Sequence, residues 1–382
     1  MTNVFVVSSA RTPIGRATKG SLVDVRPDDL AAAAVIAALA RGGVPADAVD
    51  DVQVGCGYPE KEQGYNLGRR VALLSGMPVT VPGSTVSRMC ASSLQAVRTG
   101  AHAILAGESD IHVAGGVESL TRVGRTTRPE DKHPGLQGDP LPDVYIPMGL
   151  TAEKVATEHQ VSREDMDALA LRSHQRALSA RERGFLQKEI VPVFLADGTM
   201  VDVDDGPRPT TSLERLAALE SPFTPGGPVT AGNSCPLSDG AAAVVLASDE
   251  AVDRYDLRPR ARILATAVCG VAPDVMGIGP IEAIRTVLRR TGLTIRDIDV
   301  VELNEAFASQ VIAVCRATDI DIDEQLNPNG GAIALGHPFG MTGARLVGAA
   351  VSALEDRDGS FGLATLCIGG GQGMAVLLER VG

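Results

Sequence analysis

Apolar positions along the chain follow two patterns, a helical stripe and a short continuous run. Residues 30–55 read as an apolar helix, a glycine break, a short turn and a Val-rich run, and residues 281–304 repeat that order. Aligning the two glycine breaks also aligns the apolar positions that follow, as in the pairs Gly43/Gly292, Val44/Leu293, Val49/Ile298, Val52/Val301 and Val54/Leu303. Helices that alternate with short strands predict parallel or mixed sheets covered by helices. We therefore predict an α/β protein made of two duplicated halves.

After each repeated unit come a Gly-punctuated loop, a helix of small residues and an apolar strand. In the first half the helix is predicted to run from Cys90 to Gly107, where glycine supplies the stop. Its buried stripe is predicted to be Leu94, Val97, Ala101, Ile104 and Leu105. In the second half the helix follows "HPFG" and the strand is "FGLATLCI". Equivalent loops of the two halves are expected to meet at a shared cleft.

The segment between the two halves differs from them in composition. Residues 119–150 are rich in Pro, Gly and charge, and polar helices follow, one of which opens with a predicted Ser162/Asp165 cap. We predict that residues 119–237 form an inserted loop domain, a lid or binding lobe. The first half would then comprise residues 1–118 and 238–259, and the second half residues 260–382.

Composition narrows the function classes. The 382 residues carry a formal charge of −12, which argues against nucleic acid as a partner, and no apolar run is long enough to cross a membrane. Six cysteines are scattered without a C-x-x-C pair, so we expect neither a zinc site nor a disulfide framework. Because the N-terminus has no basic leader, we expect a cytoplasmic protein with reduced thiols.

Cys90 lies where a predicted turn gives way to a helix. Unpaired N–H groups and the helix dipole at such a position favour the thiolate, which would suit a nucleophile. On this stretch alone, we favour the alternative of a small buried cysteine with no chemical role.

Three further segments carry candidate chemistry. Asn304 ends a predicted strand, where it could serve a site or cap the next helix. His337 lies in a loop dense in glycine, and Cys367 ends an apolar strand that three glycines follow. No Lys-Ser/Thr pair follows those glycines, which excludes a phosphate loop. One imidazole and two thiols on equivalent loops favour acyl transfer through a cysteine.

The segments "CASSLQA", "NEAFA", "GHPFGMTGAR" and "CIGGGQG", in this order, resemble the thiolases, the acyl-CoA C-acetyltransferases, and the resemblance covers essentially the whole chain. It implies two duplicated α/β/α/β/α halves with a loop domain that binds coenzyme A. It implies no permanently bound cofactor and no metal, with acyl-CoA and CoA as substrates. A homodimer or homotetramer is expected.

The resemblance also implies roles for residues that match the motifs. Cys90 would become acylated, His337 would activate it, and Cys367 would be the acid/base for the other substrate. Asn304, through a water, and His337 would form one oxyanion hole, and the N–H groups of Cys90 and Gly369 the other. The implied contacts with CoA or the acyl chain are Arg208 at the adenine, Ala231 and Cys235 along the pantetheine, and Met148, Met276 and Phe307 near the acyl group.

The chain departs from the family pattern at four positions. Ser87 stands where Asn is usual, Ser93 where Gly is usual, and Thr342 and Cys235 each replace a usual Ser. None of these changes removes an implied catalytic group, so they bear on substrate preference.

The expected activity is CoA-dependent thiolytic cleavage of a 3-oxoacyl-CoA. The segments "SDGAAA" and "IPMGLTAE" look more like those of the degradative thiolases than those of the biosynthetic acetoacetyl-CoA type. Two alternatives stay open: a biosynthetic acetoacetyl-CoA thiolase, and a non-catalytic protein that binds an acyl-CoA or a sterol. Two other enzyme classes fit the sequence less well. A ketosynthase usually lacks the segment "CIGGGQG", and an unrelated cysteine hydrolase would have no role for Cys367. A basic run could attract CoA phosphates, although we favour a solvated loop face for it; it consists of Arg122, Arg125, Arg128 and Lys132.

Overall fold

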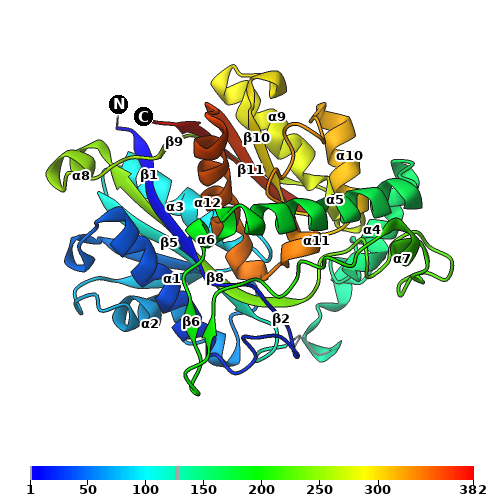
Figure 1. The fold of residues 1–382 in the computed structure, drawn as a ribbon, viewed down its shortest axis with the longest axis horizontal. Helices are drawn as coiled ribbons and strands as arrows, with labels where there is room; N and C mark the ends of the chain where they lie inside the picture. Colours follow the sequence, from blue (N-terminus) through cyan, green and yellow to red (C-terminus); the bar gives the residue numbers. More distant parts are fainter. Residues whose placement is uncertain (1, 125–128) are drawn as a thin grey trace.

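The fold is built around one mixed sheet that joins two similar halves (Figure 1). The computed structural model describes residues 2–124 and 129–382. The main strand order is β10-β11-β12-β9-β1-β8-β5-β3-β4, and the short β2 (Gly15–Arg16) pairs with β8. The chain termini lie close together at one end of the molecule (Figure 1).

The elements of the first half alternate as the apolar pattern predicts. They are β1 (Val4–Arg11), α1 (Pro27–Gly42), β3 (Asp51–Gly55), α2 (Leu67–Leu74), β4 (Gly83–Val86), α3 (Ser92–Leu105), β5 (Ile111–Ser119), β8 (Ser238–Ser248) and α8 (Asp249–Arg254). Those of the second half are β9 (Ala261–Gly270), the 3₁₀ segment η5 (Pro273–Ile278), α9 (Gly279–Thr291), β10 (Val300–Leu303), α10 (Ala308–Thr318), α11 (Ala332–Leu335), α12 (Phe339–Arg357), β11 (Phe361–Ile368) and β12 (Gln372–Arg380).

Strand pairing follows the same rule in both halves. β3 pairs parallel with β5, and β5 and β1 pair antiparallel with β8. In the second half β10 pairs parallel with β11, and β11 and β9 pair antiparallel with β12. β1 and β9 join the halves through antiparallel pairing of Phe5 with Arg262 and of Val6 with Ala261. The predicted duplicated α/β architecture is confirmed.

The aligned glycines end equivalent helices. Gly43 (φ 64°) caps α1 and Gly292 (φ 73°) caps α9, both in the left-handed conformation that glycine adopts without strain. A 3₁₀ turn and a strand follow each of them. The repeat seen in the sequence is therefore a repeat of whole structural units.

α3 and α12 pack against each other in the core, where both contribute to one apolar cluster. A Cβ at Gly343 would lie 2.3 Å from the backbone nitrogen of Leu94, so glycine permits a close approach of the two helices. Four residues of the predicted stripe of α3 are buried, but Leu105 is 57% exposed, and its prediction as buried is wrong. Leu105 is the last helical residue, where the chain already turns outward to Ala106 and Gly107.

The inserted segment contains α4 (Met148–Glu158), α5 (Arg163–Glu182), α6 (Phe185–Glu189), β6 (Val193–Phe194), β7 (Met200–Val201) and α7 (Leu213–Ala217). Val155, Met166 and Leu169 of α4 and α5 share an apolar cluster with Val311 of α10, so these helices pack on the second half. The Ser162 hydroxyl accepts a hydrogen bond from the N–H of Asp165 (3.1 Å), as the sequence predicts. Within the described residues no helix is long and apolar enough to cross a membrane.

Candidate active site

Cys90 lies in a tight turn between β4 and α3. Met89 adopts φ 45°, and the Ser92 hydroxyl fastens the turn by donating to the Met89 carbonyl (2.6 Å) and accepting from the Arg88 N–H (2.9 Å). α3 begins at Ser92 with Ala91 as its cap, so Cys90 precedes the helix instead of opening its first turn. The turn, more than the helix, therefore sets the position of the thiol.

His337 is buried and precedes α12 in the same way. Its Nδ1 lies 2.7 Å from the Thr342 hydroxyl, which itself donates to the Pro338 carbonyl (2.8 Å). Because that hydroxyl proton is already committed, Nδ1 carries the ring proton and Nε2 keeps its lone pair. Burial and the positive charge of Arg345 lower the pKa of His337 to about 3, so the ring is neutral at physiological pH.

Asn304 follows β10 directly and faces this imidazole. Its Nδ2 lies 3.3 Å from Nε2 of His337, and its backbone N–H donates to the Thr365 carbonyl of β11 (3.0 Å). The Oδ1 atom is buried and has no protein partner. Phe307 occupies the cap position of α10, so Asn304 is not a helix cap. The geometry supports the alternative that a site uses this amide.

Cys367 is the penultimate residue of β11 and is buried. Burial, followed by the charges that Cys90 and Cys235 would carry as thiolates, raises the pKa of Cys367 well above its ordinary value. The Cys367 thiol therefore holds its proton at neutral pH and is suited to act first as an acid. The three cysteines are near enough to influence one another, and they come from three separate segments.

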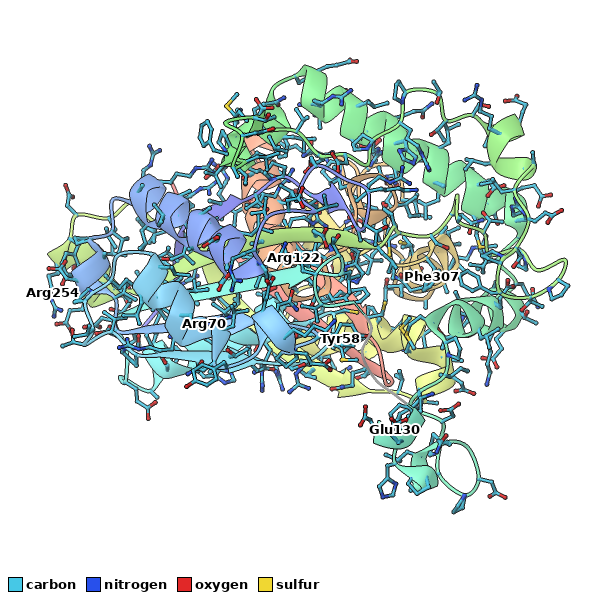
Figure 2. All side chains as sticks on the ribbon, turned by 90° about the horizontal axis from the view of Figure 1, so that it is seen from below. Tyr58, Arg70, Arg122, Glu130, Arg254 and Phe307 are labelled. Atoms are coloured by element: carbon cyan, nitrogen blue, oxygen red, sulfur yellow. The ribbon has the colours of Figure 1, made fainter. Side chains whose placement is uncertain are left out.

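The residues predicted to touch the acyl chain share one apolar cluster with Cys367. Met276 of η5, Phe307 and Cys367 belong to one apolar cluster, against which Met148 is packed. The Met148 sulfur is the nearest atom to a Cβ built on Gly369, at 3.6 Å. Phe307, seen near α10 in Figure 2, makes an edge-to-face contact with Phe223 at 6.3 Å between ring centroids.

The segment predicted to lie along the pantetheine also approaches the site. The backbone N–H of Cys235 donates to the Ala306 carbonyl (3.1 Å), and Ser234 forms a β-bridge with Phe307. Ala231, four residues earlier, is exposed. The structure thus brings Cys235 to the site and leaves Ala231 at the surface of the insertion.

Arg208 lies next to α5, where it contacts the side chain of His174. Its backbone N–H donates to Nδ1 of His174 (3.2 Å), and its Nη2 lies 3.1 Å from Nε2 of the same ring. A neutral imidazole accepts only one hydrogen bond, so one of these two contacts is unsatisfied. Burial and the charges of Arg208 and Arg16 lower the pKa of His174 to about 4. The assignment of Arg208 to CoA stays a prediction.

Two departures from the family pattern flank Cys90. The buried Ser93 hydroxyl accepts a hydrogen bond from the Ala344 N–H of α12 (2.9 Å), whereas the Ser87 hydroxyl makes a longer bond to the Gly57 carbonyl (3.3 Å). Ser93 therefore links the helix that follows Cys90 to the helix that follows His337.

We expect Ser93→Ala to lower the free energy of unfolding by about 1 kcal/mol, because the Ala344 N–H loses an acceptor. Ser87→Ala, the matched control, is expected to change it by less than about half that amount. Denaturant unfolding measures both values. Equal losses in the two variants would contradict the link between the helices.

Sequence reasoning missed two buried acids near the site. The first, Glu118 in β5, accepts hydrogen bonds from Gly57 N–H (2.7 Å) and Gly340 N–H (3.0 Å), and burial raises its pKa. It thereby ties the loop after β3 to the start of α12. The single acid in the mainly apolar strand "IHVAGGVES" is the signal that could have revealed it.

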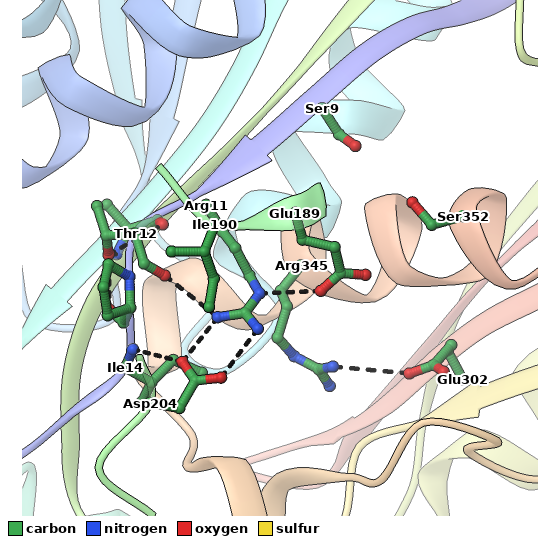
Figure 3. Close-up of polar contacts among 12 residues, drawn as sticks. Ser9, Arg11, Thr12, Ile14, Glu189, Ile190, Asp204, Glu302, Arg345 and Ser352 are labelled. Carbon is green, nitrogen blue, oxygen red and sulfur yellow. Dashed lines mark hydrogen bonds and ion pairs between the residues drawn. The ribbon is translucent and has the colours of Figure 1, made fainter. Parts of the chain in front are cut away.

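The second acid, Glu302 in β10, faces Arg345 of α12 at 3.6 Å, and both side chains are buried (Figure 3). Burial, opposed by Arg345, raises the pKa of Glu302 to about 8. The folded state then holds a proton that the unfolded state releases above its ordinary pKa of 4.5. Stability therefore decreases as pH rises from about 4.5 to about 8.

Glu302→Gln is expected to flatten this dependence, since glutamine does not titrate. Melting temperatures measured between pH 5 and pH 9 test the expectation against the unmodified protein. An unchanged slope would mean that Glu302 is ionised throughout that range.

Two members of the basic run, Arg125 and Arg128, lie outside the described residues. Arg122 forms an ion pair with Glu62 at 2.5 Å, and Lys132 lies 5.4 Å from the Tyr145 ring centroid. In residues 2–124 and 129–382 no group of three His, Cys, Asp or Glu side chains is arranged to hold a metal ion.

Known families match the chain over nearly its whole length. The family described as "Thiolase, N-terminal domain" matches residues 4–250, and "Thiolase, C-terminal domain" matches residues 257–380. The chain belongs to the thiolase family. A ketosynthase or an unrelated cysteine hydrolase is thereby excluded.

Characterised thiolases resemble this one closely. It is 48% identical to the beta-ketoadipyl-CoA thiolase of Pseudomonas aeruginosa (99% of each chain) and 45% identical to the 3-ketoacyl-CoA thiolase of Bacillus subtilis (99% of this chain, 100% of the relative). The crystal structure of the acetyl-CoA acetyltransferase of Bacillus anthracis superposes with a TM-score of 0.93 at 37% identity, covering 100% of this thiolase and 99% of that chain. The crystal structure of human mitochondrial 3-ketoacyl-CoA thiolase in complex with CoA superposes with a TM-score of 0.91 at 39% identity. This match covers 99% of this thiolase and 98% of that chain.

Proposed function

We propose that this acyltransferase cleaves a 3-oxoacyl-CoA with a second molecule of CoA, through an acyl group carried on Cys90. The observation that carries the proposal is the neutral, buried imidazole of His337. Its ring proton is fixed on Nδ1 by Thr342, and its Nε2 lone pair is available as a base. A non-catalytic binding protein would not need a base held in one tautomer.

In the first half-reaction His337 Nε2 takes the proton of Cys90, and the thiolate attacks the 3-keto carbon. The oxyanion that forms is held by the N–H groups of Cys90 and Gly369. The bond between C2 and C3 then breaks. The leaving acetyl-CoA enolate, whose oxygen faces His337 and a water held by Asn304, takes the proton of Cys367. Acetyl-CoA departs and the shortened acyl group stays on Cys90.

In the second half-reaction the Cys367 thiolate takes the proton of a new CoA thiol. The CoA thiolate attacks the acyl carbon on Cys90, and the Cys90 sulfur leaves and recovers its proton from His337. Each protein group ends in its starting state, so the cycle needs no metal or redox partner, and CoA acts as a substrate. Run backwards, the same steps form a carbon–carbon bond.

Substrate choice is proposed from the named relatives, which include thiolases for beta-ketoadipyl-CoA and for 3-ketoacyl-CoA. We propose the degradative direction, with a 3-oxoacyl-CoA as the acyl donor, including one with a terminal carboxylate such as 3-oxoadipyl-CoA. Arg208, Ala231 and Cys235 are proposed to contact CoA, and Met148, Met276 and Phe307 the acyl chain. A biosynthetic acetoacetyl-CoA thiolase is the alternative, which a chain-length series of kcat/KM values distinguishes.

Mass spectrometry after mixing with acetoacetyl-CoA or 3-oxoadipyl-CoA tests the proposed chemistry. An acyl adduct on Cys90 that free CoA removes, and that Cys90→Ala lacks, is expected. Tight CoA binding without an adduct for any 3-oxoacyl-CoA would favour a binding protein instead. Light scattering tests the proposed homodimer or homotetramer, for which a mass of two or four times 39.6 kDa is expected.

A further inference from the structure

The two turns that bear the thiols come from different halves of the chain. The first contains Cys90 and is closed by backbone bonds from Ala91 N–H to the Arg88 carbonyl (2.9 Å) and from Ser92 N–H to the Met89 carbonyl (3.1 Å). The second joins β11 to β12 through glycines, of which Gly370 and Gly371 both have φ 86°. A backbone bond from Gly371 N–H to the Ile368 carbonyl (3.2 Å) closes this second turn. The bonds within each turn do not fix the position of one turn relative to the other.

One side-chain hydrogen bond crosses between the turns. Nη1 of Arg88, two residues before Cys90, donates to Oε1 of Gln372 at 2.7 Å, and Gln372 is the residue that closes the glycine turn. The two residues are 284 positions apart in the sequence.

The same guanidinium also bonds within its own half. Nε of Arg88 donates to Oε1 of Gln95 on α3 at 3.0 Å. Both acceptors are neutral amides, and the described residues place no carboxylate in an ion pair with Arg88. Burial and the nearby charge of Arg98 lower the pKa of Arg88. A charged donor on a neutral acceptor forms a hydrogen bond stronger than a neutral pair.

We propose that Arg88 and Gln372 form a clamp that sets the distance between the turn of Cys90 and the turn of Gly369, and with it the spacing of the two N–H donors of one oxyanion hole. They are positioning residues, since neither has a role in the proposed chemistry itself. The inference rests on the proposed function, in which the N–H groups of Cys90 and Gly369 share one oxygen.

The physical need for a clamp follows from the geometry of such a hole. Each donor must come within about 2.7–3.1 Å of the same oxyanion. Donors on one turn hold that spacing through the backbone, but here the donors belong to separate halves. A misplacement of about 1 Å lowers the rate by roughly a hundredfold. A cross-link at 2.7 Å, adjacent to both turns, limits such a misplacement.

The two amides on Arg88 provide a matched pair of variants. Gln372→Ala removes the bond between the turns, and Gln95→Ala removes the bond within the first half. We expect Gln372→Ala to lower kcat by roughly 10- to 100-fold with KM for CoA changed less than about threefold. Gln95→Ala is expected to leave kcat within about threefold of the unmodified enzyme. Gln372→Glu, which keeps an acceptor for Arg88, is expected to restore most of the loss.

If the bond between Arg88 and Gln372 only stabilised the fold, the three variants would give a different pattern of kcat values. Equal effects of Gln372→Ala and Gln95→Ala on kcat, or a loss in Gln372→Ala that Gln372→Glu does not restore, would overturn the clamp. Melting temperatures of the three variants identify any that lose activity by unfolding.

A second measurement does not depend on turnover. The reagent 1,3-dichloroacetone alkylates two neighbouring thiols in turn, and peptide mass spectrometry gives the ratio of protein bridged between Cys90 and Cys367 to singly alkylated protein. We expect Gln372→Ala to change that ratio at least threefold and Gln95→Ala to leave it unchanged. If the unmodified protein forms no acyl adduct, the proposed function fails, while this ratio still tests the clamp. Identical ratios in both variants would overturn it.

Discussion

Replacing His337 by glutamine is expected to lower kcat by about 10³- to 10⁴-fold, because the base that takes the Cys90 proton is lost. Glutamine retains a donor for the proposed oxyanion, so KM is expected to change far less than kcat. Stopped-flow measurement of Cys90 acylation isolates the affected step. Acylation within about tenfold of the unmodified rate would show that Cys90 is activated by another group.

Thr342 offers a graded control for the same prediction. Thr342→Ser keeps the hydroxyl that accepts from Nδ1 and donates to Pro338, and we expect kcat within about threefold of normal. Thr342→Val has nearly the same shape but no hydroxyl, so the ring loses the group that selects its tautomer. A loss of roughly 10- to 100-fold is expected for valine, and equal activity of the two variants would contradict the tautomer argument.

Replacing Arg11 by methionine is expected to lower the free energy of unfolding by about 3–5 kcal/mol, the cost of breaking a buried ion pair on one side. Arg11 bonds Asp204 through two nitrogens (2.8 and 2.9 Å) and Glu189 through a third (3.0 Å), and all three side chains are buried (Figure 3). The network fastens β1 to the inserted segment. Without the guanidinium, two carboxylates remain buried near each other.

Arg254 supplies the matched control at the edge of the molecule (Figure 2). It pairs with Glu250 and Asp110, but its side chain is 48% exposed, and water screens such pairs. We expect Arg254→Met to lower the free energy of unfolding by less than about 1 kcal/mol. Denaturant unfolding of both variants measures the difference. Equal losses of unfolding free energy in the two variants would show that the buried ion pairs of Arg11 stabilise the fold no more than the exposed ion pairs of Arg254.

The order of elements could be predicted, and candidate site residues could be chosen, because both depend on local patterns. The spacing of apolar residues and the glycine stops at Gly43 and Gly292 fix each unit without reference to distant residues. Cys90 and His337 stand out because each lies just before a helix, and Cys367 stands out because it lies near the end of an apolar strand. The family match confirms the predicted fold and family, whereas the roles of individual residues stay proposals.

Contacts between distant segments could not be predicted in this way. Arg88 and Gln372 each look like an ordinary polar residue in the sequence, and only the packing of the two halves brings them within 2.7 Å. Arg11 likewise meets Glu189 and Asp204 through the path of the insertion. The error at Leu105 has the same origin, since helical spacing does not show where the neighbouring surface ends.

Cys90 and His337 occupy equivalent places in the two halves. Each directly precedes the cap residue of its helix, α3 or α12, and these two helices pack side by side. Glu118 and Cys367 are likewise the penultimate residues of the equivalent strands β5 and β11.

A symmetric pair of identical single halves would carry the same residue at both members of each pair, hence two nucleophiles or two bases. One gene encoding both halves removes that restriction, because each copy accumulates substitutions independently. The covalent link between the halves therefore allows equivalent positions to carry different residues. A dimer of identical single halves would place two like groups at its symmetry axis. The fused chain instead places a thiol, Cys90, and an imidazole, His337, at equivalent positions.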